Sequence, residues 1–105
     1  MALFTYETKK DTRSGFGSGM EYLSQHNPKV VALCADLIGS LKLEGFIKNS
    51  PERFFQTGIA EANMIGISAG LTLGGFIPFA TTFANFGTGR VYDQIRQSVA
   101  YSGKN

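Results

Sequence analysis

Glu61 is the residue with the clearest potential for chemistry, because it stands just before the longest uncharged stretch of the chain. It lies in QTGIAEANMIGISAGLTLGGF, and no charged residue occurs from Ala62 to Gly89. A carboxylate is costly to bury among apolar residues unless it is paired or has a function. In the first turn of a helix it would also be favoured by the helix dipole. A water-exposed first-turn glutamate and a buried functional carboxylate therefore both remain open.

A second set of polar candidates follows the apolar run VVALCA, in the segment DLIGS. If this run is a strand of a parallel sheet, Asp36 and Ser40 lie beyond its carboxyl end, where open α/β sheets bind their ligands. An aspartate in this position can also simply stabilise a turn. The residue types alone do not decide between the two.

Four phenylalanines, Phe76, Phe79, Phe83 and Phe86, follow Glu61 along the chain. Most of such a series belongs in a hydrophobic core. Phe83 and Phe86, however, come after the expected strand FIPFATT, at its carboxyl end, where a flat ligand could stack on them. A carboxylate and an aromatic platform at adjacent strand ends would suit a nitrogen heterocycle.

The elements that must position these residues alternate between strands and helices, which indicates an α/β fold with a parallel sheet. VVALCA is a continuous apolar run, as expected for a strand covered on both faces. Pro78 argues against a central position for its strand, and Val91, Ile95 and Val99 recur at helical spacing. The expected elements are a helix from Asp11 or Thr12 to about Gln25, a strand at 30–35, a short helix or loop at 41–51, a short strand at 53–58, a helix at 59–73 that is buried on nearly every side, a strand at 76–82 and a helix at 85–101.

Composition narrows the class of protein. The chain has 105 residues, 43% of them hydrophobic, which is enough for a core. A net charge of +2 is too small to imply nucleic acid or an anionic membrane surface. The single cysteine, Cys34, excludes an internal disulfide and a zinc cluster, and it is expected to be buried and inert.

Two further patterns have simple interpretations. The uncharged run MIGISAGLTLGGFIPFA is short for a membrane span and is interrupted by glycines and a proline. The segment SGFGSG differs from a dinucleotide fingerprint at the third glycine and follows no strand, so it indicates a helix packed closely against a neighbour. The N-terminus has no pattern of a secretory signal, and a cytoplasmic location is expected.

The segment RFFQTGIAEANMIGISAGLTLGGFIPFATTFANFGTGRVYDQIRQSVAYS resembles the pyrimidine-binding domain of the transketolase family. The likeness is in particular to the C-terminal subunit of split bacterial transketolases, and it runs from about Lys10 to the end of the chain. GIAEANMIGISAGL, GGFIPFATTF and RVYDQ stand in the family's order and spacing. RVYDQ is also similar to the related deoxyxylulose-phosphate synthases.

This resemblance implies thiamine diphosphate as the cofactor. Glu61 matches the glutamate that bonds N1′ of the cofactor's aminopyrimidine ring, Phe83 matches the residue stacked on that ring, and Phe86 matches its partner three residues on. Asp36 resembles an aspartate close to the cofactor. A buried functional carboxylate at Glu61 would explain its apolar neighbours.

The resemblance also suggests residues for the substrate. Arg13 and Ser40 resemble positions that bind the sugar phosphate, and Arg90 matches the arginine before YDQ in deoxyxylulose-phosphate synthases. The function implied is transfer of a two-carbon ketol unit between sugar phosphates. A deoxyxylulose-phosphate synthase and a non-catalytic α/β interaction module are the alternatives.

A partner is implied as well, because family enzymes hold Mg²⁺ and the diphosphate on a separate domain or on an N-terminal subunit. No such metal motif occurs in this sequence. Residues 1–105, with an N-terminal arm at 1–11, are therefore expected to form an incomplete three-layer α/β pyrimidine-binding domain. The isolated chain is expected to be inactive, and the complete enzyme to be a homodimer or heterotetramer.

Overall fold

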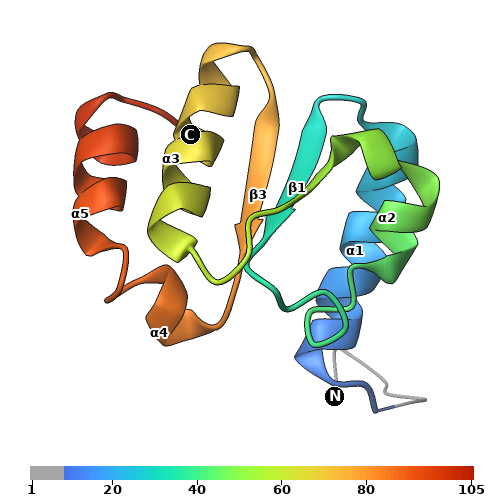
Figure 1. Ribbon diagram of the computed structural model, residues 1–105. Coiled ribbons are helices and arrows are strands. Elements are labelled where there is room, and N and C mark those ends of the chain that lie inside the picture. Colours follow the sequence, from blue (N-terminus) through green and yellow to red (C-terminus); the bar gives the residue numbers. More distant parts are fainter. Residues whose placement is uncertain (1–8) are drawn as a thin grey trace, which may run out of the picture.

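A parallel sheet with helices on both faces organises the chain (Figure 1). The computed structural model describes residues 9–105, so the arm predicted at 1–11 falls mostly outside the described part. The elements are α1 (Thr12–His26), β1 (Val30–Cys34), α2 (Glu44–Asn49), η1 (Pro51–Arg53), β2 (Phe54–Gln56), α3 (Glu61–Leu73), β3 (Ile77–Thr81), α4 (Ala84–Gly87), α5 (Tyr92–Gln94) and η2 (Ile95–Tyr101).

The sheet has the order β2-β1-β3, and both neighbours run parallel to β1. Every residue of the central strand β1 is buried, which confirms the strand predicted from VVALCA. Pro78 lies in β3, beside Val31 in the register. Within the described residues β3 is an outer strand of the sheet, a place where a proline is tolerated.

The alternation of side chains along β1 builds two cores. Val30, Ala32 and Cys34 face α1 and α2, where Met20 and Phe46 pack against them. Val31, Leu33 and Ala35 face the other way and pack against Met64 of α3. Since successive residues of a strand point to opposite faces, a strand between two helical layers must be apolar throughout. The three-layer α/β fold is confirmed (Figure 1).

Helix α1 begins where predicted and approaches the loop before α2 very closely. Asp11 caps it by accepting a hydrogen bond of 2.9 Å from the backbone N–H of Ser14. A Cβ at Gly17 would lie 2.4 Å from the carbonyl oxygen of Lys42, so only glycine fits there. The interpretation of SGFGSG as a close-packing segment is therefore confirmed at Gly17.

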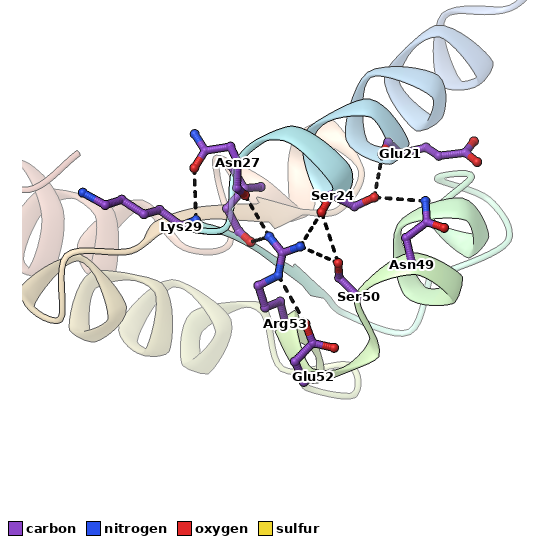
Figure 2. A network of polar contacts seen from close by, with 9 residues as sticks. Glu21, Ser24, Asn27, Lys29, Asn49, Ser50, Glu52 and Arg53 are labelled. Carbon is purple, nitrogen blue, oxygen red and sulfur yellow. Dashed lines mark hydrogen bonds and ion pairs between the residues drawn. The ribbon is translucent and has the colours of Figure 1, made fainter.

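Arg53 joins the end of α1 to the start of β1 (Figure 2). Its Nη1 donates to the carbonyl oxygens of Asn27 at 2.8 Å and Val30 at 3.0 Å. Its Nη2 donates to the carbonyl oxygen of Ser24 and to Oγ of Ser50. A cation is favourable beside the carbonyl groups at a helix C-terminus, so this largely buried guanidinium holds three segments together.

The prediction that α3 is buried on nearly every side is wrong. Met64, Ser68 and Ala69 are buried, whereas Ile67 is 38% and Leu73 72% exposed. The helix packs against β1 and β3 on one side and against α5 and η2 on another, and Ile67 and Leu73 remain exposed. Apolar sequence on all sides therefore does not mean burial on all sides within this part of the chain.

The continuous helix predicted at 85–101 is also wrong. The chain forms a single turn at α4, leaves helical geometry at Thr88 (φ −127°, ψ −74°), and resumes at α5, which continues into the π-helical η2. Gly87 and Gly89 flank the break, and glycine costs about 1 kcal/mol relative to alanine in a helix.

The segment 41–51, for which a short helix or a loop is expected, contains the helix α2. From Lys9 to Asn105, no helix has the length and apolar character that crossing a membrane requires.

Candidate functional site

The carboxyl ends of the three strands meet at one edge of the sheet, together with the start of α3 (Figure 1). The strands end at the same level, because Cys34, the last residue of β1, pairs with Gln56 of β2 on one side and with Thr81 of β3 on the other. The segments that follow them carry most of the predicted site residues, and α1 begins near the same edge (Figure 1). Ligands of open α/β sheets bind at such an edge, so this is the candidate site.

Glu61, the first residue of α3, is buried at this edge with only 4% of its surface exposed. The alternative of a first-turn glutamate in contact with water is therefore excluded. Its carboxylate does not lie among apolar groups alone. Nη1 of Arg90 lies 3.2 Å from Oε1 and 3.3 Å from Oε2, and this ion pair compensates the buried charge.

Arg90 also contacts the aromatic part of the site. Its guanidinium carbon lies 4.1 Å from the centre of the Phe86 ring, within the range of a cation–π interaction. The rings of Phe83 and Phe86 are 6.3 Å apart and tilted by 32°. Phe83 is 42% exposed. The structure thus gathers Glu61, Arg90, Phe86 and Phe83 into one cluster, hereafter the Glu61 cluster.

Asp36 occupies the turn directly after β1, in the left-handed region with φ +59°. Its backbone N–H donates to Oε1 of Gln56 at 2.7 Å, and the N–H of Gly58 donates to the same oxygen at 3.2 Å. The exposed carboxylate of Asp36 thus sits on a turn that Gln56 fixes. Sequence reasoning missed Gln56, although a polar side chain at the last position of a strand is a recognisable signal.

A hollow of about 250 Å³ lies at the same edge, beside β3. Phe16, Leu41 and Thr82 are among its lining residues. Arg13 lies one turn of α1 before Phe16, and Ser40 directly precedes Leu41, so two of the three predicted substrate-binding residues are close in sequence to residues that line it. The remaining lining residues are Ala80 and Thr81.

Two threonines at the end of β3 differ in their hydrogen bonding. Oγ1 of Thr81 donates to the carbonyl oxygen of Leu33 at 2.7 Å, which ties β3 to β1. Oγ1 of Thr82 is buried without a hydrogen-bond partner among the described residues. A buried hydroxyl without a partner is costly, which is a reason to expect a polar ligand group near Thr82.

The predicted residues fall into two groups that the described contacts do not connect. Arg13 is half exposed, and its Nε lies 3.7 Å from Oδ1 of Asp11. No hydrogen bond or ion pair between described residues joins Arg13, Ser40 or Asp36 to the Glu61 cluster.

A larger hollow of about 430 Å³ lies along α5 and η2, and none of the seven predicted residues lines it.

Neither Cys34 nor a group of clustered metal ligands adds to the candidate site within residues 9–105. Burial raises the pKa of the Cys34 thiol, which keeps it protonated at neutral pH and matches the inert cysteine expected from the sequence. Between Lys9 and Asn105, no three side chains of His, Cys, Asp or Glu gather as metal ligands would.

Comparison with known proteins identifies relatives over nearly the whole chain. The family described as "Transketolase, pyrimidine binding domain" matches residues 8–105. A protein of Methanocaldococcus jannaschii named as a transketolase C-terminal section is 45% identical over 91% of this chain and 30% of its own length. The 1-deoxy-D-xylulose-5-phosphate synthase 1 of Geobacter sulfurreducens is 39% identical over 80% of this chain and 13% of its own length.

A solved structure agrees with the sequence comparisons. The structure described as "Split gene transketolase, inactive beta4 tetramer" superposes with a TM-score of 0.78 at 50% identity, covering 87% of this chain and 30% of the other. The 105 residues thus span less than a third of the length of these relatives.

Proposed function

Because this chain belongs to the transketolase family as a pyrimidine-binding domain, we propose that it supplies the aminopyrimidine-binding half of a thiamine diphosphate site. The observation that carries the proposal is the buried carboxylate of Glu61 at the carboxyl edge of a parallel sheet. A buried carboxylate at the start of a helix, next to an aromatic pair, is what recognition of a flat, basic nitrogen ring requires.

The residues of the Glu61 cluster fit this cofactor. Glu61 would hold N1′ of the ring and exchange a proton with it, which an amide or a hydroxyl at this position could not do. Phe83, which is partly exposed, would stack against the ring, and Phe86 would support Phe83. Asp36 would lie near the cofactor from the adjacent strand end. Thiamine diphosphate, when bound, supplies the nucleophilic carbon for cleaving and forming carbon–carbon bonds.

The other half of the site would come from a partner. A diphosphate needs a cation to neutralise it, usually Mg²⁺ with oxygen ligands, and this chain spans less than a third of its longer relatives. We therefore assign Mg²⁺ and the diphosphate to a separate domain or N-terminal subunit. The similar split-gene transketolase structure is described as a tetramer, which favours assembly of this chain into an oligomer.

Transketolase chemistry is the preferred reaction, with transfer of a two-carbon ketol unit between sugar phosphates. A deoxyxylulose-phosphate synthase is the second candidate, because such synthases are among the relatives and the segment RVYDQ, which begins at Arg90, resembles them. The two differ in their donors. Release of glyceraldehyde phosphate from a ketose phosphate would support the first, and decarboxylation of pyruvate the second.

Cofactor binding tests the proposal directly. The chain is titrated with thiamine diphosphate and Mg²⁺, first alone and then with the diphosphate-binding subunit. We expect calorimetric heat of binding only in the mixture, because each partner offers half of the site. Micromolar binding by the chain alone would overturn the need for a partner. No binding in the mixture would leave a non-catalytic interaction module as the better description.

Arg13→Ala in the complete assembly is expected to weaken the binding of phosphorylated donors selectively. A guanidinium binds phosphate through charge-assisted hydrogen bonds worth about 1.5–3 kcal/mol each, so KM should rise about tenfold or more. An unphosphorylated donor such as hydroxypyruvate should be little affected. Arg13 is half exposed and lies one turn of α1 before Phe16, which lines the hollow, and this motivates the expectation.

A matched control for this variant is Lys9→Ala, which removes an exposed cation just before α1. This variant should leave KM unchanged for both phosphorylated and unphosphorylated donors. Equal losses for phosphorylated and unphosphorylated donors in Arg13→Ala would mean that Arg13 is structural.

A further inference from the structure

Arg90 makes two contacts that a flat cationic ligand of this site would make. Its guanidinium is planar and positively charged, and Nη1 lies within 3.2 and 3.3 Å of the two carboxylate oxygens of Glu61. The same group covers the ring of Phe86 at 4.1 Å. An aminopyrimidine would likewise need Glu61 as its hydrogen-bond partner, and stacking on Phe83 would bring it next to Phe86, whose ring centre is 6.3 Å away.

From this overlap we infer that Arg90 is an internal occupant of the pyrimidine site, which an incoming ring must displace from Glu61. The inference rests on the proposed function and adds a closed state to it. In the closed state, the buried carboxylate is paired and Phe86 is covered. In the open state, the guanidinium has turned away and Glu61 is available to the ring.

The surroundings of Arg90 allow such a movement without unfolding. The next residue, Val91, is completely buried and anchors the backbone. The side chain of Arg90, in contrast, is 47% exposed, so rotation about its own bonds can carry the guanidinium into water. Glu61 cannot follow, because it is buried at the first residue of α3. The pair therefore opens on the Arg90 side.

The contact itself is suited to release. A single nitrogen serves both carboxylate oxygens at more than 3 Å, instead of the shorter parallel pair of bonds that makes arginine–carboxylate pairing strong. Water around the half-exposed guanidinium screens its charge, which weakens both its pair with Glu61 and its cation–π contact with Phe86. Together they would lower the apparent affinity of the ring about five- to thirty-fold, since only the open fraction binds.

The test compares Arg90→Met with the parent in the complete assembly. Methionine keeps an unbranched apolar side chain next to Phe86 but cannot pair with Glu61. We expect the dissociation constant of thiamine diphosphate, measured by calorimetry at saturating Mg²⁺, to fall about five- to thirty-fold. The matched control is Arg96→Met, which removes an exposed arginine paired with Asp93 at 2.8 Å and should leave the affinity unchanged.

The outcomes separate this inference from the proposed function. Binding by parent and Arg90→Met with equal affinity, or weaker binding by Arg90→Met, would overturn the internal occupant and leave the cofactor site standing. Absence of binding in the parent assembly would overturn both.

A second measurement covers the case in which Arg90→Met does not fold. Arginine labelled with ¹⁵N in the parent assembly reports the guanidinium of Arg90, assigned by comparison with Arg90→Lys. Saturation with thiamine diphosphate should release it to free rotation and solvent exchange. An unchanged resonance at saturation would overturn the inference.

Discussion

Glu61→Gln in the complete assembly is expected to fold like the parent and to lose turnover by about 10²–10⁴-fold, the usual cost of removing a positioned acid–base group. Glutamine has nearly the same shape, and its amide oxygen can still accept from Nη1 of Arg90. It cannot exchange a proton with the cofactor ring. The loss should therefore appear in kcat, measured at saturating cofactor and substrate.

The control for this variant is Glu44→Gln. Glu44 is also the first residue of a helix, α2, but its side chain is exposed and lies outside the candidate site. Turnover should stay at the parent level, and the melting temperatures of both variants should be close to that of the parent. Activity of Glu61→Gln within a few-fold of the parent would remove Glu61 from the catalytic role.

The strands were predictable because their signal is local and strong. A strand that is apolar at every position, as VVALCA is, must be covered on both faces to keep these residues from water. In the structure β1 is buried throughout. The same pattern also located the edge of the sheet at which candidate residues gather. Asp36, Ser40 and Phe83 could be placed near that edge because each follows an expected strand.

The two wrong predictions concern features that depend on what packs around an element. Periodicity describes which residues of α3 are apolar, but not which side meets another part of the protein, and Ile67 and Leu73 are exposed here. In the C-terminal segment, Val91, Ile95 and Val99 all lie after the break at Thr88, so their helical spacing describes only the part that follows it. Spacing cannot detect such a break, because helix propensity and tertiary contacts decide it.

The pairing of Glu61 with Arg90 was also beyond the sequence. The two residues are separated by a helix, a strand and a turn, and only the folded chain brings their charges together. Sequence reasoning placed Arg90 with the substrate-binding residues, and that role stays a prediction. The isolation of Glu61 in the sequence was informative about its burial, but gave no sign of the cation that compensates its charge.

Arg53→Met is expected to lower the free energy of unfolding by about 2–4 kcal/mol, because hydrogen bonds to a charged group contribute about 1.5–3 kcal/mol each and buried carbonyl groups lose their donor. Nη1 donates to the carbonyl oxygens of Asn27 and Val30, and Nη2 to that of Ser24 (Figure 2). Methionine can fill part of the space beside Phe46 but supplies no donor. Urea denaturation of variant and parent measures the difference.

Two controls identify the cause of that loss. Arg53→Lys keeps the charge but has a single ammonium group in place of the planar guanidinium. Its free energy of unfolding should therefore lie between those of Arg53→Met and the parent. Arg96→Met removes an exposed pair with Asp93 and should change stability by less than about 1 kcal/mol. If Arg53→Met were no more destabilising than Arg96→Met, water would be replacing the guanidinium at the three carbonyl groups. The junction of α1 and β1 would then be held by the packing of Met20 and Phe46 against β1.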